Sequence, residues 1–193
     1  MSKNKLDARV IKTRRLIEET FLRLLADTSF EKLTTTRLIK ECMISKGTFY
    51  AHYLDKYDLA ETLMDRELDF FGKLLTQRFQ DESQEVSDIS QMVSQAMEES
   101  RYLTIFEHIQ LPTRKPFILE LQSVYQSAFR DYLLKKGYQG ELELQSSLFC
   151  SLVMTYISYI RQGHKSLSIE ELRSEIDYFF ENMAQSFPLN NRQ

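Results

Sequence analysis

The side chains best suited to recognition chemistry lie in one short segment, residues 45–52. Ser45 is placed to cap a helix by accepting a hydrogen bond from the backbone N–H of Gly47 or Thr48. The backbone N–H groups at the start of such a helix, and the positive end of its dipole, favour a phosphate or the edge of a base. Lys46 adds a positive charge at the same place. The segment is therefore suited to binding a polyanion.

The two faces of this predicted helix differ in character. Lys46 and Tyr50 are i, i+4 neighbours on one face, whereas Phe49 and Tyr53 share another face and can be buried against the preceding helices. Gly47 lets a partner approach the backbone closely. A helix that enters the major groove of DNA needs a polar exposed face together with an apolar anchor. The pattern therefore predicts a recognition helix.

Other helices must hold the recognition helix in place. A first helix is expected over about 7–27, where apolar residues recur at helical spacing. Thr34 is placed to cap a second helix, which can turn Leu38 and Ile39 inward. The recognition helix and the two helices before it form a unit that we call the head. A long fourth helix is expected over about 56–79 and connects the head to the rest of the chain. A first helix, two short helices and a long connecting helix are thus predicted.

Helical periodicity continues through the remainder, without strand alternation. Glycines at two connections, Gly137 with Gly140 and then Gly163, can close helices in the left-handed conformation. The sequence therefore predicts an all-α protein with a helix-turn-helix domain over residues 1–57 and a second helical domain over residues 58–193. In the second domain, helices are expected near 86–100, 102–110, 116–136, 141–162 and 168–187.

Charge is distributed unevenly between these two parts. Residues 1–57 contain twelve Lys or Arg and seven Asp or Glu, a net charge of +5. The remainder contains thirteen basic and twenty-one acidic residues, a net charge of −8. A basic head on an acidic body suits a polyanion-binding domain joined to one that does not touch nucleic acid.

Several functional classes find no support in the sequence. No apolar run is long enough to cross a bilayer and the N-terminus lacks a secretory pattern, so a cytoplasmic location without a membrane partner is expected. His108 and His164 lack the spacing of metal ligands. No nucleophile elbow or glycine-rich phosphate loop occurs. We expect neither an enzyme nor a metal or cofactor site, and we expect Cys42 and Cys150 to be reduced, buried thiols.

The stretch from Leu33 to Leu59 resembles the helix-turn-helix of TetR-family transcriptional regulators, most closely at residues 45–50, 52–53 and 55–56. The resemblance implies a fold of about nine helices and a homodimer that binds an operator in double-stranded DNA. Positions that match the family's operator contacts are Thr35, Thr36, Ser45, Lys46, Gly47, Thr48, Tyr50, His52 and Lys56.

Within this set the resemblance assigns most side chains to phosphate. Base readout falls chiefly to Lys46, with Thr36, Gly47 and His52 as further candidates. The chain departs from the family in the turn between the second and third helices, where Met43 stands at a position that is often glycine. The sequence therefore predicts the module without fixing the exact geometry of that turn.

The family resemblance implies two roles for the second domain, and the sequence allows both. The first is effector binding, for which aromatic rings with a few polar handles give the composition of a small-molecule pocket. Ordinary core packing explains the same residues. The candidates are Tyr102, Phe106, His108, Phe117, Tyr125, Phe129 and Tyr132.

The second role is dimerisation, because one short recognition helix contacts too few base pairs for specificity. Two heads related by a two-fold axis, spaced roughly 34–36 Å apart, would read a pseudo-palindrome. The last two helices are the predicted interface, although burial within one monomer would explain the same pattern. The candidates are Leu152, Tyr156, Ile160, Leu172, Ile176, Phe179 and Phe180.

We interpret the chain as a ligand-responsive repressor in which an unknown small-molecule effector changes the separation or tilt of the two heads. Two alternatives remain open. A weaker likeness, in residues 30–34, 55–59 and 159–172, is to the branch that includes dihydroxyacetone-kinase operon activators, so an activator is one of them. The other is a helical adaptor of the same fold that acts through a protein partner.

Overall fold

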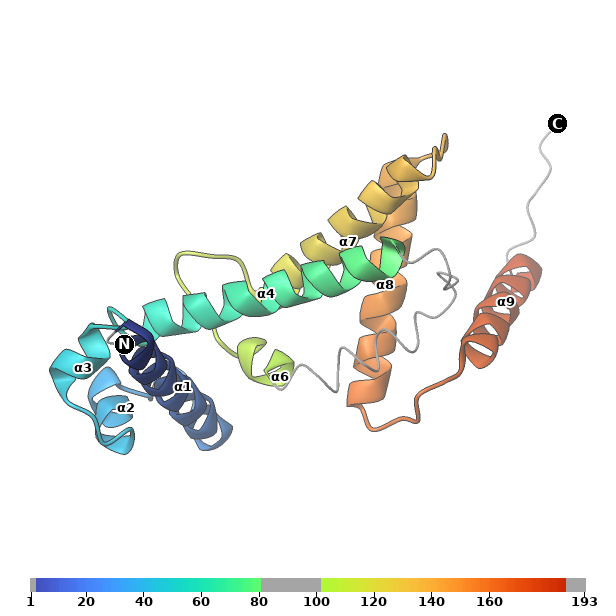
Figure 1. The fold of residues 1–193 in the computed structure, drawn as a ribbon. Helices are drawn as coiled ribbons and strands as arrows, with labels where there is room; N and C mark the ends of the chain where they lie inside the picture. The colour runs from blue at the N-terminus through green and yellow to red at the C-terminus, as the bar shows by residue number, and fades with distance from the viewer. Residues whose placement is uncertain (1–2, 81–101, 187–193) are drawn as a thin grey trace. The chain divides into compact units, whose positions relative to one another are not determined.

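The computed structural model describes residues 3–80 and 102–186, and all the regular structure in these two stretches is helical (Figure 1). This confirms the predicted all-α class. The helix predicted near 86–100 lies outside the described residues. The helices are α1 Lys3–Asp27, α2 Thr35–Glu41, α3 Lys46–Tyr50, α4 Lys56–Gln80, α6 Leu103–Phe106, α7 Phe117–Lys135, α8 Leu142–Arg161 and α9 Ile169–Ser186.

The helix predicted over 102–110 is much shorter than expected, because α6 ends at Phe106. Beyond it the backbone N–H groups of His108 and Ile109 donate to carbonyls three residues earlier. This tighter turn lets Ile109 and Leu111 be buried together with Phe106. A continued α-helix would have placed Leu111 on a different face from Phe106, so burial of apolar side chains ends the helix.

The described residues form two compact units. Unit one comprises residues 3–73 and 102–124, and unit two comprises residues 74–80 and 125–186. Both α4 and α7 contribute residues to each unit. The predicted boundary between residues 57 and 58 lies inside unit one. That boundary concerns the division of function and stays a prediction.

In unit one, α1, α2 and α3 gather beside the start of α4 (Figure 1). The predicted apolar stripe of α1 faces inward, since Ile17, Phe21 and Leu24 are buried. Both predicted caps are present. The Thr34 side chain accepts from the backbone N–H of Arg37, and Ser45 closes the start of α3 in the same way. Local sequence therefore sets where α2 and α3 begin.

The turn between α2 and α3 forms despite the absence of glycine. Met43 adopts a φ of 52°, in the left-handed region. This conformation costs a residue with a side chain about 1–2 kcal/mol relative to the right-handed one. The backbone N–H of Ile44 bonds to the carbonyl of Ile39 and closes the turn. Met43 therefore leaves the helix-turn-helix geometry intact.

Unit two contains a group of buried and half-buried aromatic rings. Phe129 and Phe149 are stacked with centroids 4.1 Å apart and ring planes 12° apart. Phe79, near the end of α4, contacts both rings and stacks on Tyr132 at 5.0 Å. These contacts join α4, α7 and α8. They stabilise this packing, because aromatic pairs add to the free energy gained from burial alone.

Cys42 and Cys150 are buried and neither forms a disulfide, as predicted. Burial raises the pKa of both thiols, so neither is a reactive thiolate near neutral pH. Among the helices described here, none is both long and apolar enough to cross a membrane.

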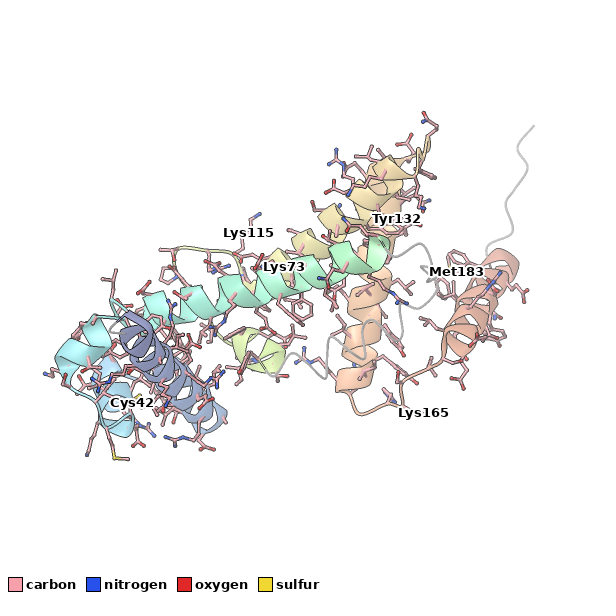
Figure 2. The ribbon with its side chains drawn as sticks, in the orientation of Figure 1. Cys42, Lys73, Lys115, Tyr132, Lys165 and Met183 are labelled. Carbon is pink, nitrogen blue, oxygen red and sulfur yellow. The ribbon has the colours of Figure 1, made fainter. Side chains whose placement is uncertain are left out.

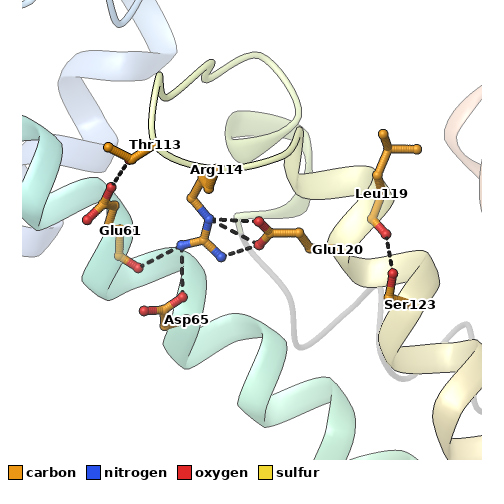
Figure 3. A network of polar contacts seen from close by, with 7 residues as sticks. All are labelled: Glu61, Asp65, Thr113, Arg114, Leu119, Glu120 and Ser123. Atoms are coloured by element: carbon orange, nitrogen blue, oxygen red, sulfur yellow. Dashed lines mark hydrogen bonds and ion pairs between the residues drawn. The ribbon is translucent and has the colours of Figure 1, made fainter.

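Arg114 joins the segment after α6 to α4 and α7 within unit one (Figure 3). Its guanidinium donates to both carboxylate oxygens of Glu120, lies 2.8 Å from Asp65 Oδ1 and reaches the carbonyl of Glu61 at 3.4 Å. Glu61 also accepts from the hydroxyl of Thr113. The hydrogen bond to Glu120 is the main reason why the pKa of Arg114 is raised.

We expect Arg114→Met to destabilise the protein by about 1–3 kcal/mol, because Glu120 would be left half-buried without its cation. Urea unfolding followed by circular dichroism measures the change. The matched control is Lys115→Met, at the neighbouring exposed position that points away from the helices (Figure 2). Equal stabilities of the two variants would contradict the role given to Arg114.

Candidate nucleic-acid interface

The two faces predicted for the recognition helix are present in α3. Phe49 and Tyr53 are almost completely buried, whereas Lys46, Gly47 and Tyr50 are exposed. The Phe49 ring meets the Tyr50 ring edge-on at 5.6 Å and lies 6.2 Å from the Tyr53 ring. Because Phe49 is fixed in the core, the polar face of α3 must point to solvent.

Ser45 and Thr48 form a compact cap at the start of α3. Ser45 Oγ accepts from the Thr48 N–H at 3.0 Å, and the two hydroxyl oxygens lie 2.8 Å apart. Ser45 is exposed and Thr48 is half-buried. Each hydroxyl can take part in more than one hydrogen bond, so both retain the capacity to contact a phosphate.

The other predicted contact residues border this face. Thr36, in the first turn of α2, is exposed. Thr35 is half-buried and its Oγ1 accepts from the backbone N–H of Lys56 at 3.3 Å. His52 is half-buried, with its ring 6.5 Å from that of Tyr53. The hydrogen bond between Thr35 and Lys56 brings the start of α2 to the start of α4.

Lys56 differs from expectation. It was predicted to neutralise a phosphate, but it is only 7% exposed. Its Nζ donates to the carbonyls of Phe30 and Leu33, each at 2.7 Å, and lies 3.3 Å from that of Glu31. The ammonium is also 4.5 Å from the centroid of the Phe30 ring. Burial lowers the pKa of Lys56, although Glu31 and Asp55 oppose this. The side chain belongs to the interior, and its assignment as a phosphate ligand is corrected.

Glu18 is a structural residue that the sequence did not single out. Glu18 is 8% exposed, and its carboxylate accepts from the Tyr53 hydroxyl at 2.7 Å and from both terminal nitrogens of Arg66 at 3.2 and 2.8 Å. Arg14 donates to the Tyr53 hydroxyl at 3.1 Å. Burial, followed by the hydrogen bond to Glu18, raises the pKa of Tyr53 to about 12. An acidic residue directly beside the apolar stripe of α1 is the sequence signal that could have indicated it.

Two basic residues of α2 were also missed. Arg37 and Lys40 are exposed, and Arg37 Nη1 donates to the Thr28 hydroxyl at 3.2 Å. Their spacing of three residues places them on neighbouring positions of one helix face. They add positive charge to the same three-helix head as Lys46.

The predicted pocket residues fall into two groups. In unit one, Phe106 contacts the rings of Tyr102 and Phe117, and both phenylalanines are buried. In unit two, Phe129 and Tyr132 belong to the aromatic group described above. Tyr125 is buried and His108 is exposed. Phe106, Phe117 and Tyr125 pack in the core of their own units, and a role of the seven residues in ligand binding stays a prediction.

The predicted interface residues also divide. Tyr156 is buried, and its hydroxyl accepts from the Leu167 N–H at 2.8 Å, so it serves the connection between α8 and α9 in its own chain. Leu172 is buried as well. In contrast, Phe179 and Phe180 are 57% and 62% exposed. The half-buried members are Leu152, Ile160 and Ile176.

Sequence comparison identifies the head. Residues 17–63 match the family model of bacterial regulatory proteins of the tetR family. An HTH-type transcriptional regulator of Staphylococcus aureus strain USA300 is 38% identical over 58 residues, which are 30% of this chain and 31% of that protein. The same match is found in strains NCTC 8325 and COL. The aligned region thus spans about a third of the length of these curated relatives.

Structural comparison extends the likeness of fold over most of the chain. A protein from Syntrophomonas wolfei assigned to the TetR family of transcriptional regulators has a TM-score of 0.61 at 16% identity, with 93% of this chain and 98% of that one covered. E. coli NemR in its reduced form has a TM-score of 0.57 at 13% identity, with 86% and 97% covered. A gamma-butyrolactone receptor, an ArpA-like protein, has a TM-score of 0.56 at 14% identity, with 88% and 95% covered.

The helix-turn-helix head carries the family signature, and the helical fold around it is the one that solved members share. The family consists of regulatory proteins that bind DNA, and its members are not enzymes. Residues 17–63 of this chain therefore match the tetR family of bacterial regulatory proteins, within a helical fold similar to that of a solved protein assigned to the family.

Proposed function

We propose that the protein is a transcriptional regulator that binds a pseudo-palindromic operator as a homodimer and responds to a small-molecule effector in the cytoplasm. The observation that carries the proposal is the two-faced α3. Phe49 is buried while Lys46 and Tyr50 are exposed on a helix whose start is capped by Ser45. This arrangement meets the requirements of a helix that reads the major groove.

Gly47 supports the same function. A Cβ built at this position meets no atom closer than Ser45 Oγ at 3.8 Å, and its backbone φ does not lie in the left-handed region. The fold itself therefore does not require glycine here. A partner that approaches the backbone of α3 closely gives a reason for glycine, and DNA in contact with the recognition helix is such a partner.

Exposed aromatic residues on α9 support dimerisation. Tyr178, Phe179 and Phe180 are each more than half exposed, and Met183 is 44% exposed. An apolar surface of this kind marks an interaction site, and a symmetric dimer would bury it against its own copy. We infer that the interface is built on α9 and the exposed residues of α8, such as Leu148, rather than on Tyr156.

A hollow in unit two supports effector binding. It has a volume of about 310 Å³ and is lined by Thr76, Phe79, Asp131, Tyr132 and Lys135, among others. The volume lies within the range of small-molecule sites. Aromatic rings beside a lysine suit a planar ligand with an acidic group. One protein of the same fold is a receptor for gamma-butyrolactone, which fits a sensing role.

We propose repression as the sign of regulation, because a dimer bound over a promoter blocks transcription without any further contact. The effector must prefer one arrangement of the two heads. A shift of ten- to hundredfold in operator affinity requires about 1.4–2.8 kcal/mol of coupling.

An activator, or an adaptor acting through a protein partner, is the alternative. Lower expression of the target genes after deletion would favour the activator, and heteromeric association without operator binding would favour the adaptor.

DNA binding is tested first by selecting bound fragments from the source genome with the purified protein. We expect Lys46→Ala to weaken binding to a selected fragment by about 1–3 kcal/mol, because a contact to a base edge would be lost. Titration of a labelled fragment measures this. Lys165→Ala, at an exposed position in unit two, is the control. Equal affinity of wild type and Lys46→Ala would count against this face of α3.

For Gly47→Ala we expect two opposite effects. Stability should rise by about 0.5–1 kcal/mol, because alanine favours the helix and the added methyl has space. Operator affinity should fall, because the methyl stands where DNA approaches. Thermal melting and fragment titration measure the two effects. Gly72→Ala, in α4, is the control for a stability change without a change in affinity. Unchanged operator binding in Gly47→Ala would show that nothing approaches α3 closely.

The dimer interface is tested with Phe180→Glu. We expect this variant to be monomeric, because a two-fold axis near α9 would bring the added carboxylate close to its symmetry mate. Sedimentation equilibrium measures the mass, and fragment titration should show weaker binding to the pseudo-palindrome. Tyr138→Glu, at an exposed position after α7, is the matched control and should stay dimeric. A dimeric Phe180→Glu would place the interface elsewhere.

A further inference from the structure

The ammonium of Lys56 has all its hydrogen-bonding capacity used within the protein. A lysine ammonium carries three N–H donors and no acceptor. Three carbonyl oxygens surround it, those of Phe30 and Leu33 at 2.7 Å and that of Glu31 at 3.3 Å. A DNA phosphate could be contacted only if one of these bonds broke. Lys56 therefore acts on the head rather than on DNA directly.

The three carbonyls belong to the turn between α1 and α2. Within that turn the N–H groups of Lys32 and Leu33 both donate to the Ser29 carbonyl. The ammonium also lies over the faces of the Phe30 and Tyr57 rings, at 4.5 and 5.0 Å from their centroids. Charge, hydrogen bonds and rings together fix the turn against the first residues of α4.

The backbone of the same residue holds α2. The Lys56 N–H donates to Thr35 Oγ1 at 3.3 Å, and Thr35 is the first residue of α2. A single residue thus connects α4 to the preceding turn through its side chain and to α2 through its backbone. The exposed Thr36 follows directly, and α3 is joined to α2 by the short turn at Met43.

A second contact fixes α4 ten positions further along. Arg66 donates twice to Glu18 of α1, and Glu18 accepts from Tyr53, which follows α3. Two largely buried charged groups therefore tie the first part of α4 to the head at separate points. The contacts of Lys56 lie next to α2, and the contact between Arg66 and Glu18 lies next to the end of α3.

We propose that Lys56 is a positioning residue for DNA recognition, which sets α2 and α3 relative to α4 so that both helices can meet the operator together. The proposal rests on the proposed DNA-binding function. A phosphate ligand and a positioning residue differ in a measurable way. Losing a phosphate contact weakens binding to every duplex and reduces the slope of log affinity against log salt by about 0.9. Losing the positioning of α2 and α3 weakens specific binding and leaves that slope unchanged.

The test compares wild type and Lys56→Met on two probes at several salt concentrations. One probe is a 30-base-pair duplex selected from genomic fragments by the wild-type protein, and the other has the same bases in shuffled order. We expect affinity for the selected duplex to fall at least tenfold. Affinity for the shuffled duplex, and both salt slopes, should change little. Lys165→Met is the control.

Other outcomes overturn the proposal. Equal losses on both probes with a smaller slope would make Lys56 a phosphate ligand, and equal losses without a slope change would make its role one of general stability. No loss on either probe would remove any role. If Lys56→Met does not fold, Phe30→Leu takes its place, because it removes the ring beside the ammonium and keeps the carbonyl. For this variant we expect a smaller loss of affinity, and only for the selected duplex. A wild-type protein that binds both probes equally would instead refute the proposed function.

Discussion

Burial of Phe49 and Tyr53 is the constraint on which the recognition surface depends. α3 has five residues, and an isolated helix of that length is unstable in water. Its stability must come from tertiary packing, which Phe49 supplies from within the helix and Tyr53 from just beyond it. Because these two side chains face inward, Lys46 and Tyr50 must face outward. The apolar face of α3 thus decides which side chains are available to DNA.

Two largely buried charged groups turn this packing into a defined geometry. Burying an ion is unfavourable unless its partners satisfy it completely. Lys56 meets this condition with three carbonyls, and Glu18 meets it with Tyr53 and Arg66. Apolar contacts tolerate small displacements of one helix along another, whereas a hydrogen bond of 2.7 Å in a poorly solvated site does not. The head is therefore held by directional contacts at the places where α4 meets it.

The parts of the fold that depend on local sequence could be predicted, and the parts that depend on tertiary contacts could not. The caps at Thr34 and Ser45 could be predicted because each capping side chain and the backbone N–H that donates to it are only three residues apart. The inward direction of Lys56 was missed because its acceptors precede it by more than twenty residues. A lysine at a helix start gives the same local pattern whether it faces solvent or a distant turn.

The same distinction explains the aromatic residues of the second domain. Composition could show that many rings were present, but it could not show that Phe129 would stack on Phe149 or that the Tyr156 hydroxyl would bond to Leu167. The family signature covers residues 17–63, while the fold is shared over most of the chain at 13–16% identity. Core packing tolerates exchanges among apolar residues of similar size. A short helix that must bury one face and keep the other polar tolerates fewer exchanges. The head is constrained on both sides, so its sequence is the part from which function can be inferred.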